Sequence, residues 1–106
     1  MTTFDDRERQ EETRFKHQQE LAFKARNRGN KMFGLWVAEQ LGLSGEEAQS
    51  YAKDVVIADF DSPGDEDIYT KVRMDLEAKS VEISDHVLQK RLQELRQAAA
   101  EQIRTE

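Results

Sequence analysis

Histidine is the side chain most often used for acid–base and metal chemistry near neutral pH, and this chain has two, His17 and His86. It has no cysteine, which excludes a thiol nucleophile, a disulfide and a zinc–thiolate site. Neither histidine follows a glutamate by three positions, as in di-metal helical bundles, and no His-Glu-x-x-His or glycine-rich phosphate motif occurs. We interpret both histidines as surface residues, and we predict that the chain is not an enzyme and has no cofactor or metal site.

An acidic segment further along the chain partly matches a calcium-binding loop. Residues at positions 1, 3, 6, 7 and 9 of such a loop are Asp59, Asp61, Gly64, Asp65 and Asp67. Position 5 is Pro63, which has no side-chain oxygen, and position 12 is Thr70 instead of the bidentate glutamate. We therefore interpret the acidic residues as helix-capping and solubilising groups.

Four basic residues fall within eight positions, at Lys24, Arg26, Arg28 and Lys31. A nucleic-acid surface would need interleaved aromatic residues and a larger basic face. The acidic body argues the same way, because residues 41–106 carry 8 basic and 15 acidic groups and would repel phosphates. The basic run is therefore either a solvated helix face or a contact surface for an acidic protein partner, and no nucleic-acid partner is expected.

Apolar residues are too scattered for a membrane segment and too few at the N-terminus for a core. The longest apolar runs have four residues, whereas a bilayer span needs about 20, so no direct membrane insertion is expected. The charged start of the chain is no secretory signal, and the lack of cysteine fits a cytoplasmic protein. Residues 1–20 contain only Phe4 and Phe15 as large apolar side chains. We predict that residues 1–19 are disordered or nascent-helical and that residues 20–106 fold.

Hydrophobic spacing predicts four helices, over residues 20–41, 45–60, 65–79 and 85–104. In the first, a stripe of Leu21, Ala25, Met32 and Trp36 is widened by residues 33, 37 and 41. The aromatic residues Phe23, Phe33 and Trp36 are expected in the core. Residues expected to be buried in the later helices are Ala48, Tyr51, Ala52, Val55, Val56, Phe60, Ile68, Val72, Leu76, Leu88, Leu92, Leu95, Ala99 and Ile103.

Local signals mark the ends of these helices. Gly42 is a suitable stop for the first helix, and Gly29 and Gly34 weaken it by about 1 kcal/mol each relative to alanine. Ser44 with Glu47 forms a predicted capping box, and Ser84 is expected to cap the last helix. Since short loops join the helices, the sequence predicts a small all-α antiparallel four-helix bundle, monomeric when free.

Seven short blocks, in fixed order and spacing along nearly the whole chain, match a known family. They are Phe4-Asp-Asp-Arg7-Glu, Glu20-Leu-Ala-Phe23-Lys-Ala25, Asn30-Lys31-Met-Phe-Gly34-Leu35-Trp36-Val-Ala-Glu39, Leu41-Gly-Leu-Ser44-Gly, Tyr51-Ala-Lys-Asp-Val55-Val, Ala58-Asp-Phe60 and Gly64-Asp-Glu-Asp67. On these blocks the chain resembles the zeta subunit of alphaproteobacterial F-type ATP synthases, an ATPase-inhibitor family. Two departures from the family pattern are Glu11, where relatives often have an apolar residue, and Gly29, which predicts a hinge in the first long helix.

The resemblance implies a function. Members are four-helix bundles whose N-terminal segment inserts as a helix into a catalytic interface of the rotary head, made of alpha, beta and gamma subunits, and blocks hydrolytic rotation. It also implies a cytoplasmic protein, peripheral to the inner membrane through the synthase. The residues that would act in this way are the apolar anchors Phe4 and Phe15, the cations Arg7, Arg9, Arg14 and Lys16, and the helix-start acids Asp5, Asp6 and Glu8. Two alternatives remain: a generic helical adaptor acting through its surface, and a bundle that binds a small ligand near Trp36.

Overall fold

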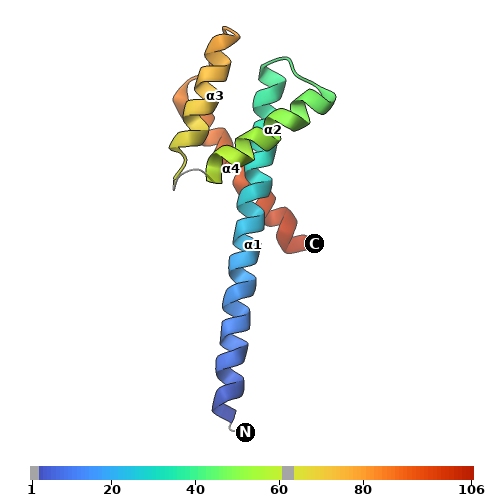
Figure 1. Cartoon of the computed structure of the whole chain (residues 1–106), viewed down its shortest axis with the longest axis vertical. Helices are drawn as coiled ribbons and strands as arrows, with labels where there is room; N and C mark the ends of the chain where they lie inside the picture. The colour runs from blue at the N-terminus through green and yellow to red at the C-terminus, as the bar shows by residue number, and fades with distance from the viewer. Residues whose placement is uncertain (1–2, 61–63) are drawn as a thin grey trace.

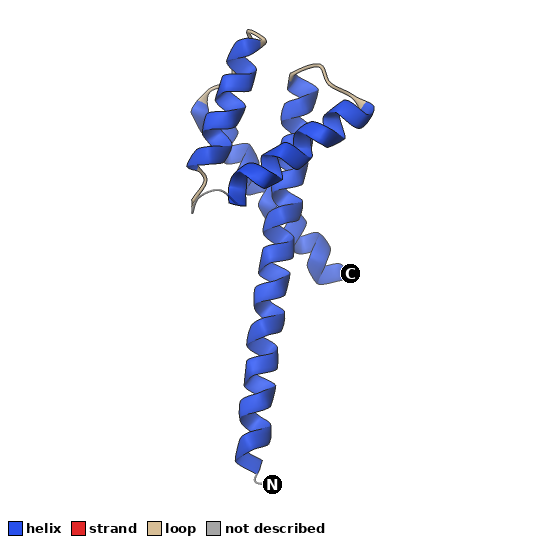
Figure 2. Cartoon of the chain, in the orientation of Figure 1, coloured by secondary structure: helices blue, strands red, loops and turns tan. Residues whose placement is uncertain are grey.

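The computed structural model describes the backbone of residues 3–60 and 64–106 and the side chains of residues 14–60 and 64–106. These residues form four helices and no strand: α1 Thr3–Gln40, α2 Gly45–Phe60, α3 Glu66–Ala78 and α4 Asp85–Thr105 (Figure 2). Consecutive helices run in alternating directions (Figure 1). The predicted all-α antiparallel four-helix bundle is confirmed.

Helix α1 is the central element of the molecule. Helices α2 and α4 pack against its C-terminal half, and α3 packs against α2. The N-terminal half of α1 extends away from the other helices (Figure 1), which gives the molecule overall dimensions of 66 × 26 × 22 Å. Its 38 residues correspond to about 57 Å at 1.5 Å per residue, so α1 accounts for most of the long axis.

Helix α1 begins well before the predicted start of the first bundle helix at residue 20. It runs from Thr3 without a break, and it also passes through Gly29, where a hinge was predicted. The reason lies in the composition of residues 3–28, which include no glycine or proline and many Glu, Arg, Gln and Ala residues with high helix propensity. Of the two states predicted for residues 1–19, the structure describes the helical one from Thr3 onward.

The core lies where all four helices meet. Its largest cluster contains Phe33, Val37, Val55, Ile68, Val72, Leu76, Leu88 and Leu92. The predicted stripes of α3 and α4 are confirmed, because Ile68, Val72 and Leu76 are buried and so are Leu88, Leu92, Ala99 and Ile103. Phe60 was predicted to be buried, but 57 % of it is exposed.

The buried face of α1 is rotated about the helix axis, by part of a turn, from the centre of the predicted apolar stripe. Leu21 and Phe23 are exposed, by 36 % and 55 %, and Trp36 is only half-buried. The fully buried positions of α1 are Phe33 and Val37, which belong to the widened stripe as predicted, together with Gly29, Asn30, Gly34 and Ala38, which do not. Half of these are glycine or alanine and one is polar, so a search for large apolar residues overlooks this face.

The two glycines of this face allow close helix packing. A Cβ atom added to Gly29 would lie 2.6 Å from the Cα of Arg96 in α4. A Cβ added to Gly34 would lie 2.7 Å from the Cα of Ala52 in α2. These distances are shorter than any normal carbon contact, so α2 and α4 come as near to α1 as the absence of a side chain permits.

The helix ends follow local chemistry, with one exception. Gly42 ends α1 with φ +80°, and the N–H of Leu43 donates to the carbonyl of Ala38 at 2.9 Å, as expected of a glycine stop. Ser84 caps α4, since its Oγ accepts from the N–H of Val87 at 3.3 Å. The predicted boundary of α2 is confirmed, but the Ser44 cap is not formed, because the backbone turns into the helix through Gly45 at φ +57°.

Candidate partner-binding site

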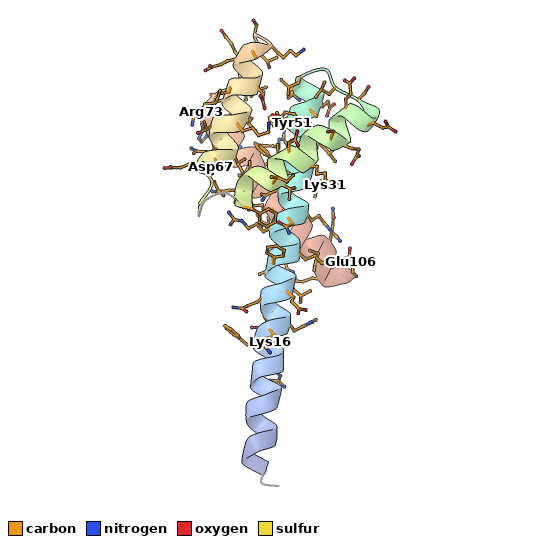
Figure 3. The ribbon with its side chains drawn as sticks, in the orientation of Figure 1. Lys16, Lys31, Tyr51, Asp67, Arg73 and Glu106 are labelled. Atoms are coloured by element: carbon orange, nitrogen blue, oxygen red, sulfur yellow. The ribbon has the colours of Figure 1, made fainter. Side chains whose placement is uncertain are left out.

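The part of α1 that projects from the bundle contains every residue predicted to inhibit. We call residues 3–22 the N-terminal arm. All its described side chains, residues 14–22, are exposed. They include Arg14, Phe15, Lys16 and His17, and Phe15 is 62 % exposed. Figure 3 shows Lys16 on the arm, remote from the other helices.

The remaining predicted site residues belong to the first turns of the arm. The backbone of Phe4, Asp5, Asp6, Arg7, Glu8 and Arg9 is helical, and their side chains lie outside the described residues. The helix keeps all nine predicted residues on one continuous rod. Its geometry separates positions 4 and 15 by about 16 Å along the axis and about three turns, so they share a face.

Two aromatic rings lie where the arm leaves the bundle. Phe23 of α1 and Phe60 at the end of α2 are tilted by 39°, with ring centres 5.8 Å apart. More than half of each residue is exposed, so this pair adds an apolar surface to the base of the arm. Both were predicted as core residues on hydrophobic spacing alone. They pack against each other at the surface instead.

Next to this pair in the sequence of α1 and α2 lie polar and charged side chains that meet others from the start of α3 and from α4. We call them the interhelix ion cluster: Arg26 and Asn30 of α1, Asp59 of α2, Asp65 before α3 and Arg96 of α4. Arg26 binds Asp59 in a bidentate manner, with Nε–Oδ2 and Nη2–Oδ1 distances of 2.7 and 2.8 Å. Arg96 binds Asp65 in the same way, at 3.0 and 2.9 Å.

Asn30 connects the two ion pairs. It is fully buried, donates from Nδ2 to Asp59 Oδ2 at 2.9 Å and accepts from Arg96 Nε at Oδ1, also at 2.9 Å. Arg26 further donates to Asp65 at 3.0 Å. Every helix of the bundle is thus joined at the base of the arm by charge-assisted hydrogen bonds, which are about twice as strong as neutral ones.

The contact between Arg26 and Asp59 favours the charged form of both groups. The hydrogen bond from Arg26 holds the pKa of the Asp59 carboxyl below its usual value, and Asp59 in turn raises the pKa of the Arg26 guanidinium. The guanidinium groups occupy the carboxylate oxygens that a calcium loop would have used. Within the described part of the chain, no group of three or more potential ligands could hold a metal ion.

The basic run from Lys24 to Lys31 does not form a single face. Arg26 turns into the ion cluster, whereas Lys24 and Arg28 form ion pairs with the side chain of Glu106, the last residue of the chain. Lys31 is exposed. Spacings of four and three residues place Lys24, Arg28 and Lys31 together on the other side of α1.

The two histidines and Trp36 were the other residues considered for chemistry or ligand binding. His17 and His86 are exposed, as predicted. The Trp36 ring stacks on Phe33, with centres 6.0 Å apart, and the Arg91 guanidinium lies 5.2 Å from its centre. Among the described residues, no helix has the length and apolar character that crossing a membrane requires.

Sequence reasoning missed the interhelix ion cluster. Asp59 and Asp65 were noticed as incomplete calcium ligands, and Arg26 as part of a basic run, but nothing local links them. Their partners are between 29 and 66 residues apart in the sequence. The available signal was Asn30 itself, a polar residue at helical spacing from Phe33 and Val37 and thus on an apolar face.

Comparison with known proteins decides the family. The model of the family described as ATPase inhibitor subunit zeta matches residues 1–102. The chain belongs to the zeta family. A solved structure, described as a solution NMR structure of the protein, is 43 % identical to this chain. The match covers 78 % of this chain and 94 % of that one, with a TM-score of 0.70. The comparison with curated proteins finds no match.

Membership in the zeta family sets the function at a coarse level. The family is one of ATPase inhibitor subunits, so the chain is an inhibitor associated with an ATP synthase and not a catalytic subunit. The match begins at residue 1 and includes the whole N-terminal arm.

Proposed function

We propose that this chain stops ATP hydrolysis by an F-type ATP synthase, and that its N-terminal arm is the inhibitory element. The arm enters a catalytic interface between the alpha, beta and gamma subunits of the rotary head and blocks rotation in the hydrolytic direction. The synthase holds the protein at the cytoplasmic side of the inner membrane. The observation that carries the proposal is the arm itself, a helical rod whose described side chains are all exposed.

The chemistry of the arm suits insertion between protein subunits. Phe15 is a large apolar side chain held in water, and burying it in a partner would yield about 1.5–3 kcal/mol. Arg14 and Lys16 flank it and supply charges for carboxylates of the enzyme. Phe4 provides a second apolar contact on the same face.

Continuity with α1 supports the same role. Ordering a free segment costs about 1–2 kcal/mol per residue in backbone entropy. An arm that grows from an already formed helix has its nucleation step completed, since the bundle supplies the first turns. The interhelix ion cluster then fixes the direction in which the arm leaves the bundle. The bundle therefore positions the arm for insertion.

The test is ATP hydrolysis by a purified alphaproteobacterial rotary head, measured with the full chain and with residues 20–106. We expect only the full chain to inhibit. Thermal unfolding followed by circular dichroism would establish that the shortened chain is folded. Equal inhibition by both chains would place the inhibitory surface in the bundle, and no inhibition by either would leave family membership without the activity.

A further inference from the structure

A groove between α1 and α2 carries a positive charge that the proposed function does not use. Its volume is about 850 Å³, and its lining includes Lys24, Asn27, Arg28 and Lys31 of α1 with Lys53 and Val56 of α2. Figure 3 shows Lys31 on the stretch of α1 beside α2. Four cations thus surround one concave surface in a chain whose net charge is −6.

Two of these cations have no counter-ion among the side chains that the structure describes. Lys31 and Lys53 are exposed, and neither takes part in an ion pair with any residue that the structure describes. Like charges gathered in one groove repel one another, and that repulsion is relieved when an anionic group enters. The groove is therefore better suited to an acidic occupant than to water alone.

Two of the lining cations already pair with a carboxylate of the chain. The side chain of Glu106 binds Lys24 Nζ at 3.2 Å and also pairs with Arg28 Nη1. This carboxylate is 46 % exposed, so water also reaches it. Lys31 and Lys53 line the same groove and are left for a carboxylate from outside the chain.

The number of cations in the groove favours a polypeptide as the occupant. Lys24, Arg28, Lys31 and Lys53 all belong to the lining. A single carboxylate or phosphate can neutralise only part of this charge, whereas an acidic peptide brings several carboxylates at once. Val56 supplies an apolar wall for the stem of a glutamate side chain.

We propose that the groove between α1 and α2 docks an acidic polypeptide segment of the enzyme that this chain inhibits. The assignment of the segment to that enzyme rests on the proposed function, whereas the peptide specificity of the groove does not. Since α1 carries both the arm and the groove, docking would hold the bundle in place while the arm occupies its interface. Two linked contacts bind far more tightly than either contact alone.

The first experiment titrates the full ¹⁵N-labelled chain with an end-blocked hexaglutamate peptide at about 100 mM salt and follows amide chemical shifts. We expect shifts around Asn27, Lys31 and Lys53, and at least tenfold weaker binding to the double variant Lys31→Glu/Lys53→Glu. The matched control is Lys79→Glu/Lys90→Glu, which changes the net charge equally at exposed positions outside the groove and should bind within twofold of the original chain.

Three results of the titration would overturn the proposal. Shifts confined to other surfaces would exclude the groove, and equal weakening in both double variants would reduce the effect to net charge. Tighter binding of sodium pyrophosphate than of the peptide would make the groove a small-anion site. Circular dichroism of both variants would confirm that they are folded.

The second experiment measures inhibition of the purified rotary head at 50 and 200 mM KCl. We expect Lys31→Glu/Lys53→Glu to need about tenfold more protein for half-inhibition at the lower salt, with the same maximum inhibition, while the control variant is unchanged. If the original chain does not inhibit, the proposed function fails and the titration still decides the groove. If both variants inhibit like the original chain, the acidic segment does not belong to the head.

Discussion

Gly29 of α1 lies so close to Arg96 of α4 that a Cβ atom on the glycine would stand 2.6 Å from the arginine Cα and 2.7 Å from its Cγ. The next residue of α1, Asn30, accepts a hydrogen bond from the same arginine at 2.9 Å. The close packing of α1 on α4 and the ion pairing of Arg96 therefore depend on each other. The glycine lets α4 approach, and the approach brings the Arg96 guanidinium to Asn30 and Asp65.

Replacing Gly29 by alanine should destabilise the fold although alanine is the better helix former. The gain in helix propensity is about 1 kcal/mol, but the added methyl meets backbone and not a flexible side chain, so we expect a net loss of about 1–3 kcal/mol. Chemical denaturation measures it. Gly34→Ala should behave alike against Ala52. Ala22→Gly on the exposed arm measures helix propensity without packing, and a gain of stability in Gly29→Ala would refute the packing argument.

Replacing Asp59 by asparagine should weaken the fold and flatten its response to acid. The loss at pH 7 should be about 1–3 kcal/mol, since Arg26 and Arg96 lose a nearly buried counter-ion while they remain partly solvated. Because the folded-state pKa of Asp59 lies below its usual value, its stabilisation is complete above about pH 5 and is lost as pH falls below about 4.

The measurement for Asp59 is unfolding free energy between pH 7 and pH 3. We expect the original chain to lose more stability over that range than Asp59→Asn. Glu47→Gln, at an exposed position of α2, controls for the loss of one carboxylate. Parallel pH profiles for the original chain and Asp59→Asn would show that the cluster is not linked to folding in this way.

Tyr51 should make the protein sensitive to alkali. Burial, and then a 2.8 Å hydrogen bond donated to Asp75, raise the pKa of its phenol far above the usual value of about 10. Above pH 10 the unfolded chain releases this proton and the folded chain retains it, so stability falls as pH rises, by about 1.4 kcal/mol per unit. Tyr51→Phe should lose less stability between pH 9 and pH 11.

Absorbance at about 295 nm follows the ionisation of both tyrosines, and comparison with Tyr51→Phe separates the two contributions. Burial also raises the pKa of Tyr69, though less, so part of the alkaline sensitivity remains in Tyr51→Phe. An unchanged slope of stability against pH in the variant would contradict the prediction.

Replacing Ser80 by glycine should stabilise the protein. Ser80 follows α3 with φ +57°, while the N–H of Val81 donates to the carbonyl of Leu76 at 2.9 Å. This is the geometry that Gly42 adopts after α1, but serine carries a Cβ that disfavours it. We expect a gain of about 0.5–1 kcal/mol in denaturation experiments. The reverse exchange, Gly42→Ser, should cost a similar amount, and a loss on Ser80→Gly would contradict the reasoning.

Replacing Phe15 by serine should weaken inhibition without affecting the fold. The residue is 62 % exposed on the arm, so its loss should leave the melting temperature within a degree or two while the concentration for half-inhibition rises about tenfold or more. Met74→Ser is the matched control, because Met74 is 64 % exposed on α3 and remote from the arm. Loss of inhibition in both variants would indicate a general effect of apolar surface.

Sequence reasoning succeeded where the determinants are local. Helices α3 and α4 each turn one apolar face to the core. Their buried residues therefore recur every four positions, as Ile68, Val72 and Leu76 do in α3 and Leu88 and Leu92 do in α4. Ser84 caps α4 through a hydrogen bond to a residue three positions away. Such signals depend only on neighbours in the chain.

It failed where the determinants are distant or small. Gly29 and Gly34 were predicted only to weaken the helix. Their contribution to packing depends on Arg96 and Ala52, which belong to other helices and are distant in the sequence. The ion cluster depends on Asp59 meeting Arg26 across 33 positions, which no local pattern encodes. For the proposed site, the sequence predicted which segment is exposed, but not that α1 would continue through it.

The continuity of α1 sets an angular relation between its two ends. Each residue of an α-helix advances the chain by about 1.5 Å and turns it by about 100°. Inserting one residue near position 20 would therefore swing Phe15 through more than a quarter of a circle relative to the bundle, whereas seven inserted residues would nearly restore its bearing. The number of residues between Phe15 and Arg26 therefore fixes the rotation of Phe15 about the helix axis relative to the bundle. It also sets which side of the bundle faces the partner when the arm is inserted.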